Sequence, residues 1–73
     1  MHNGFRDGSQ VIVNGSGKNN GKYYDNQLAI VLERDPYFLD YHVRFEDGTD
    51  DWLSPRYLQK PILEGKEIKE NEI

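Results

Sequence analysis

Hydrophobic and polar residues alternate strictly through the middle of the chain. In the segment LDYHVRFE, residues 39–46, every second residue starting at the leucine is apolar. Because successive side chains of a strand point to opposite faces, this period of two is typical of a half-buried strand. We expect the intervening residues, including Asp40 and His42, to face outward. The apolar face, Leu39, Tyr41, Val43 and Phe45, is expected to form the core.

Two earlier segments also have the residue types of strands. QVIVN, residues 10–14, is short and rich in β-branched residues. QLAIVLER, residues 27–34, is a continuous apolar run of strand length that ends at Asp35-Pro36. Such runs, bounded by turn residues, predict strands on both sides of the long polar stretch that separates them.

Turn signals divide the second half of the chain. Asp47-Gly48 is the commonest short hairpin signal, so TDDWL should pair back onto the alternating segment. Ser54-Pro55 ends that strand, because proline has no amide hydrogen to donate. SPRYL has the serine cap and first-turn proline of a helix start, and its length allows one 3₁₀ turn. LQKPI then predicts a short last strand.

These elements predict one all-β domain. Five short strands in so little chain cannot make a sandwich, but they can make a small closed or half-closed barrel that hides its edges. We expect a flexible N-terminus over residues 1–8 and a five-stranded barrel over residues 9–63. We also expect a disordered tail over residues 64–73, because EGKEIKENEI lacks an apolar face.

The order of the elements, with one helical turn before the last strand, resembles the SH3-like barrel superfamily. YHVRFEDGTDDWLSPRYL is similar to Tudor, chromo-barrel and related small barrels, and WLSPRYL to the late Pro-x-x-Tyr turn of true SH3 domains. SQVIVNGSGKNNGK followed by AIVLE resembles KOW-type barrels, although Gln27-Leu28 stand where those carry a glycine. The resemblance covers residues 9–62 and implies a fold more than a function.

Composition excludes several classes of protein. The 73 residues contain no cysteine, which excludes disulfides, a thiol nucleophile and a cysteine zinc site. No apolar run reaches the roughly 18 residues of a membrane span, and the N-terminus lacks the segments of a signal peptide. We therefore expect a monomeric cytoplasmic protein that does not bind membranes. The formal net charge of −4 disfavours generic binding to nucleic acids.

The stretch VNGSGKNNGKYYDN, residues 13–26, has the glycines and lysines of a phosphate-binding loop. The pattern G-x-x-x-x-G-K-[ST] fails, however, because Ser16 replaces the first glycine and Tyr23 the metal-binding hydroxyl. No long helix is predicted after Lys22 to point its amides at a phosphate. We interpret the stretch as a polar loop between two strands.

Nine aromatic residues are a high load for this length. In Tudor-like barrels, aromatic residues of the first long loop and the middle hairpin form a cage that holds methylated lysine or arginine by cation–π attraction. The resemblance implies four candidate walls with a carboxylate beside them. They are Tyr23, Tyr24, Phe45 and Trp52, with Asp47 or Asp50 as the anion.

A core role competes with the cage. Phe45 lies on the apolar face, and Trp52 is either a cross-strand packing residue or a partly exposed binding residue. Tyr23, Tyr24, Tyr37 and Tyr57 fall in predicted loops or turns, which makes them the better surface candidates. Tyrosines line the proline-peptide groove of true SH3 domains, but the ALYDY-type opening and tandem tryptophan of those domains are missing here.

The spacing of the acidic cluster and of the histidines matches no catalytic or metal-binding motif. EDGTDD, residues 46–51, does not fit the EF-hand spacing, and we interpret it as a solvated hairpin tip or a contact for a basic partner. His2 and His42 lie far apart, with no matching cluster. No serine has a nucleophile setting, and so small a barrel seldom offers a cleft for acid–base work. We expect no enzyme activity, no metal and no cofactor.

The sequence therefore predicts a non-catalytic module of bacterial or phage origin that binds a protein or peptide. Two alternatives stay open: a nucleic-acid or ribosome-associated barrel that contacts phosphates through Lys18, Lys22, Arg34, Arg44 and Arg56, and a small acidic phage protein that inhibits a host factor. The binding surface is expected to join the first long loop, the Tyr37–Phe38 turn and the 52–57 region. Its candidate residues are Tyr23, Tyr24, Tyr37, Phe38, Trp52, Arg56 and Tyr57.

Overall fold

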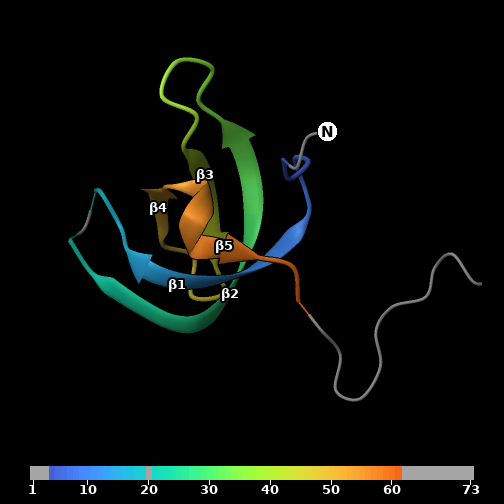
Figure 1. Ribbon diagram of the computed structural model, residues 1–73. Coiled ribbons are helices and arrows are strands. Elements are labelled where there is room, and N and C mark those ends of the chain that lie inside the picture. Colours follow the sequence, from blue (N-terminus) through green and yellow to red (C-terminus); the bar gives the residue numbers. More distant parts are fainter. Residues whose placement is uncertain (1–3, 20, 62–73) are drawn as a thin grey trace, which may run out of the picture.

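A computed structural model describes residues 4–19 and 21–61 of the chain (Figure 1). This part is all-β apart from one 3₁₀ turn, as the sequence predicts. The predicted tail, residues 64–73, lies outside the described residues, as do residues 1–3. The elements are β1 (Gln10–Ser16), β2 (Tyr23–Arg34), β3 (Tyr41–Phe45), β4 (Asp50–Leu53), η1 (Pro55–Tyr57) and β5 (Leu58–Gln59).

The five strands form one antiparallel sheet in the order β4-β3-β2-β1-β5. The long β2 joins its two halves, because residues 23–30 pair with β1 and residues 29–34 pair with β3. In Figure 1 this strand curves strongly through the molecule. The edge strands β4 and β5 are not hydrogen-bonded neighbours in the described sheet, so the sheet curls without closing.

A bulge explains the curvature of β1 and β2. The pairing register shifts between Val13 and Gly15, and Gly15 has a φ of 142°. The extra residue is in β2, where Asp25 and Asn26 lie opposite Asn14 alone. Asn26 has a φ of 54°, and its amide donates to Asn14 Oδ1 at 2.8 Å. An extra residue in one strand bends it and increases its twist. The bend carries the first residues of β2 across one end of the sheet.

The turns predicted from the sequence are present. At Asp47-Gly48, the Phe45 amide donates to the Thr49 carbonyl at 2.8 Å, and Gly48 has the positive φ that such turns favour, 91°. Ser54 caps η1, where its hydroxyl accepts from the Arg56 amide, and proline follows at the first turn. Two residues of β5 then pair with β1.

The core is a single cluster beneath the curled sheet. Tyr41, Val43 and Phe45 are buried, which confirms the core face predicted for the alternating segment at these three positions. The cluster draws on every strand, and Phe5 and Tyr57 pack against it from the flanks. Its buried members are Val11, Val13, Tyr24, Ala29, Val31, Tyr41, Val43, Phe45, Leu53 and Leu58.

Two predictions for the start of the alternating segment are wrong. Leu39 is 46% exposed and has a φ of 63°, because it belongs to the turn between β2 and β3 and not to a strand. Asp40 was expected to face outward but is buried, and its carboxylate accepts from Lys18 Nζ at 2.8 Å. The strand begins only at Tyr41, so the period of two does not extend to these two residues.

Residues 4–8, predicted to be flexible, make defined contacts with the sheet. The Gly8 amide donates to the Val31 carbonyl at 2.7 Å, and the Phe5 amide donates to Tyr41 Oη at 3.0 Å. The Phe5 ring also meets the Tyr41 ring edge-on, with centroids 5.6 Å apart. These contacts dock the segment beside β2 and β3.

Candidate functional site

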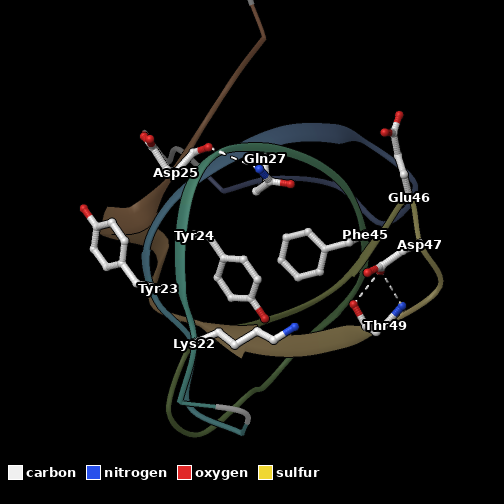
Figure 2. Close-up of a pocket in the computed structure, with 9 residues that line it drawn as sticks. All are labelled: Lys22, Tyr23, Tyr24, Asp25, Gln27, Phe45, Glu46, Asp47 and Thr49. Atoms are coloured by element: carbon white, nitrogen blue, oxygen red, sulfur yellow. Dashed lines mark hydrogen bonds between the residues drawn. The ribbon is translucent and has the colours of Figure 1, made fainter.

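A pocket of about 440 Å³ opens between the start of β2 and the β3–β4 hairpin (Figure 2). The kink at Asn26 places these two segments at the same end of the sheet, although about twenty residues separate them in the sequence. The lining combines aromatic rings, carboxylates and one lysine. It consists of Lys22, Tyr23, Tyr24, Asp25, Gln27, Phe45, Glu46, Asp47 and Thr49.

Two stacked rings form the apolar floor of this pocket. Tyr24 and Phe45 lie nearly parallel, with centroids 4.3 Å apart and 17° between their planes. Both are buried, whereas the neighbouring Tyr23 is 72% exposed. Figure 2 shows Tyr24 and Phe45 side by side at the centre of the pocket and Tyr23 at its margin. The prediction that Tyr24 lies in an exposed loop is wrong, because β2 begins four residues earlier than expected.

The rim of the pocket is acidic. Asp25, Glu46 and Asp47 are exposed carboxylates around the aromatic floor. The Thr49 hydroxyl donates to Asp47 Oδ1 at 2.6 Å, and the Thr49 amide donates to the same oxygen at 3.0 Å. These hydrogen bonds, with a smaller effect from the Lys22 ammonium, hold the pKa of Asp47 below its ordinary value of 3.8. Asp47 is therefore ionised at neutral pH.

A buried carboxylate behind the pocket fixes its floor. Asp51 is fully buried, and its Oδ2 accepts from the Tyr24 hydroxyl at 2.8 Å. Its Oδ1 accepts from the Asn19 amide at 2.7 Å, which ties down the first loop, residues 17–22 between β1 and β2. A side chain at Gly17 would overlap the Asp51 carboxylate, so glycine permits this close approach.

Trp52 lies in a different environment from the one a cage would need. Its ring stacks on His42, with centroids 4.7 Å apart and 8° between the planes, as a cross-strand pair on the outer face of the hairpin. His42 in turn contacts Glu33 Oε2 at 3.3 Å and Asp50 Oδ2 at 2.5 Å. Among the described residues, the pocket lining therefore takes in neither Trp52 nor Asp50.

The Tyr37–Phe38 turn presents a separate apolar surface. Tyr37 is 85% exposed and Phe38 76% exposed, in agreement with the surface position predicted for them. The Asp35 side chain holds this turn, because its Oδ1 accepts from the Tyr37 and Phe38 amides at 2.7 and 3.1 Å. Neither aromatic residue is in the described lining of the pocket.

The last two predicted site residues belong to η1. The Arg56 guanidinium lies over the Tyr57 ring, 5.9 Å from its centroid. Tyr57 is half-buried, packs against the core and fills the space above Gly15, where a side chain would overlap its ring. Tyr57 therefore packs against β1 at Gly15, next to the irregular pairing with β2, as well as facing the surface.

Sequence reasoning missed Gln27, Thr49 and Asp51. Thr49 follows the Asp47-Gly48 turn signal directly, and threonine at that position can donate to the turn aspartate. Asp51 alternates with Leu53 along β4, and this spacing places both on the inner face. Gln27 joins the pocket only through the kink at Asn26, which the sequence pattern does not reveal.

No family model, curated protein or solved structure matches this chain. Across residues 4–19 and 21–61, no group of three His, Asp or Glu side chains is placed to hold a metal ion. The same part of the chain contains no helix that is long and apolar enough to cross a membrane.

Proposed function

We propose that this protein is a non-catalytic module of SH3-like barrel type that binds a protein or peptide and takes a cationic side chain of its partner into the pocket. The observation that carries the proposal is the pair of stacked rings, Tyr24 and Phe45, in a pocket whose lining also contains three exposed carboxylates. Aromatic faces and carboxylates attract the same kind of ligand, a lysine or arginine side chain.

The order of the elements supports the SH3-like part of the proposal. The described residues form five antiparallel strands with one 3₁₀ turn directly before the last strand, which is the element order expected of such a barrel, although the sheet does not close. The first loop lies along the outer edge of β4, where the Lys18 amide donates to the Trp52 carbonyl at 3.0 Å. This contact covers part of an edge that the open sheet would leave unpaired.

The pocket is an open site and not a cage that encloses its ligand. It can therefore take either an ordinary or a methylated cationic side chain of a peptide. Tyr24 and Phe45 stack on each other, so they form a floor and not opposing walls. Tyr23 is an exposed aromatic residue at the margin of the pocket, where it can contact another part of the partner. A site of this kind binds weakly through one side chain, and the rest of the partner must contribute further contacts.

The electrostatics favour binding over proton transfer. A general acid or base works best with a pKa near the operating pH. Hydrogen bonds from Thr49 move the pKa of Asp47 in the opposite direction, below its ordinary value. Asp47 is thus suited to hold a permanent negative charge beside a cation, which is the role the proposal gives it.

Calorimetric titration with two synthetic hexapeptides tests the proposal. One alternates lysine and glycine, and the other replaces each lysine with glutamate. We expect the lysine peptide alone to bind, with a Kd of roughly 0.1–1 mM, because a few exposed cation–π and charge contacts give about this affinity.

Matched variants locate the binding. Asp47→Asn should weaken binding of the lysine peptide several-fold, whereas Asp7→Asn, which removes the same charge from an exposed residue outside the described pocket lining, should have little effect. Equal losses in the two variants would show that only net charge matters. Binding of a short RNA in place of the peptide, with affinity falling steeply in salt, would favour the nucleic-acid alternative.

A further inference from the structure

The pocket already contains a cation of its own. Lys22 is among the lining residues, at the end of the first loop and directly before the aromatic pair of β2. In Figure 2 its side chain extends below the Tyr24 ring, past the Tyr24 hydroxyl, and its ammonium group points toward Thr49, which lies beside Asp47. The ammonium group is therefore on the Thr49 and Asp47 side of the pocket.

A second observation agrees with this placement. The Lys22 charge contributes to the lowered pKa of Asp47, which requires the ammonium to lie within electrostatic reach of that carboxylate. The contribution is smaller than those of the Thr49 hydrogen bonds, as expected for two exposed groups in water. Among the described residues, Lys22 makes no ion pair with Asp47 within 4.0 Å, so its ammonium influences Asp47 only through a longer-range charge effect.

We propose that Lys22 is a built-in competitor for the cation site: its ammonium occupies the acidic side of the pocket in the free protein and must move away when a partner's cation enters. The inference rests on the function proposed above. It adds that Lys22 weakens the binding of a partner's cation, because the two positive charges compete for the same carboxylate.

The local backbone allows such a displacement without unfolding the loop. The Lys22 carbonyl accepts from the Gly17 amide at 2.9 Å, which fixes the base of the first loop. The side chain itself is exposed, and lysine carries a flexible four-carbon stem. Rotation of the side chain alone can therefore open the pocket, and the cost is the loss of one screened charge contact.

Replacing Lys22 with methionine tests the inference, because methionine keeps the length of the stem and removes the charge. We expect Lys22→Met to bind the lysine hexapeptide about threefold or more tightly than wild type, the size of one weak surface ion pair. Lys60→Met is the matched control, since it removes the same charge from an exposed residue outside the described pocket lining. It should change the affinity much less.

A measurement without ligand separates this inference from the proposed function. In a carbon-13 NMR titration, Lys22→Met should raise the pKa of Asp47 more than Lys60→Met does. Equal pKa values in the two variants, or tighter binding in neither, would overturn the competitor role while wild-type binding of the peptide still supports the proposed function. If neither wild type nor Lys22→Met binds the peptide, the cation site itself is wrong and the competitor role falls with it.

Discussion

Asp51 is the residue on which the geometry of the site depends most. It is fully buried and accepts hydrogen bonds from the Tyr24 hydroxyl and the Asn19 amide. Asp51→Ala leaves the buried Tyr24 hydroxyl and the partly buried Asn19 amide without this acceptor, and the loss of a buried hydrogen bond is costly. We expect the variant to lower the free energy of unfolding by about 3 kcal/mol, measured by urea denaturation.

Asp25→Ala is the control for that experiment. Asp25 is an exposed carboxylate on the pocket rim, and its replacement should change the unfolding free energy by less than about 0.5 kcal/mol. A loss below 1 kcal/mol in Asp51→Ala would mean that water replaces the carboxylate easily, contrary to the burial described here.

For single residues, the sequence predicts which face of a strand a side chain occupies better than it predicts the distant residues that the side chain contacts. Tyr41, Val43 and Phe45 are core residues because alternation alone determines their face. Asp51 was grouped with its acidic neighbours as part of a solvated tip, although the inward position beside Leu53 in β4 distinguishes it. Its burial depends on donors from the first loop, and a contact across 32 residues leaves no local sequence pattern.

The β3–β4 hairpin supplies two of the three carboxylates of the pocket, Glu46 and Asp47. Because hydrogen bonds from Thr49 lower the folded-state pKa of Asp47, the stability that this carboxylate contributes is present above about pH 4 and is lost as pH falls through the folded-state value. Thr49→Val removes the hydroxyl donor and keeps the shape. We expect the pKa of Asp47 to rise toward its ordinary value, as followed by carbon-13 NMR of the carboxyl group.

Thr49→Ser is the matching variant, since it restores the hydroxyl and should keep the pKa of Asp47 low. If the pKa were equally low in Thr49→Val, the Thr49 hydroxyl would not be what holds the Asp47 charge. Binding of the lysine peptide by Thr49→Val should also be lost at a higher pH than in wild type, because Asp47 would take up its proton earlier.

Elements bounded by clear turn residues can be predicted from the sequence, whereas the full extent of the long strand β2 cannot. Asp47-Gly48 and Ser54-Pro55 locate the hairpin and η1, because their turn chemistry is local. Residues 23–26, YYDN, lack an alternating pattern but belong to β2, where Tyr24 and Tyr23 pair with Gly15 and Ser16 of β1 beyond the bulge at residues 25–26. Tertiary pairing overrides local propensity there, and it moves Tyr24 from a predicted loop into the core.

For the whole molecule, one thin core supports all five strands. Leu53 is fully buried in that core, whereas Ile30 is on the outer face of β2 with 36% exposure. Leu53→Ala should lower the free energy of unfolding by about 2–5 kcal/mol, a large share of the total for a small domain. Ile30→Ala removes a side chain of similar size and should cost less than about 1 kcal/mol in the same thermal and urea measurements. Similar losses for both would contradict the assigned faces of the sheet.

The proposed binding of a cation in the pocket is tested most directly by NMR mapping of the labelled full-length protein with the lysine hexapeptide. We predict saturable shifts of the amides in residues 22–27 and 45–49, the two segments that contain the lining residues of the pocket, and much smaller shifts at Tyr37, Phe38 and Trp52. Shifts centred on the Tyr37–Phe38 turn, or no shifts at millimolar peptide, would contradict the account.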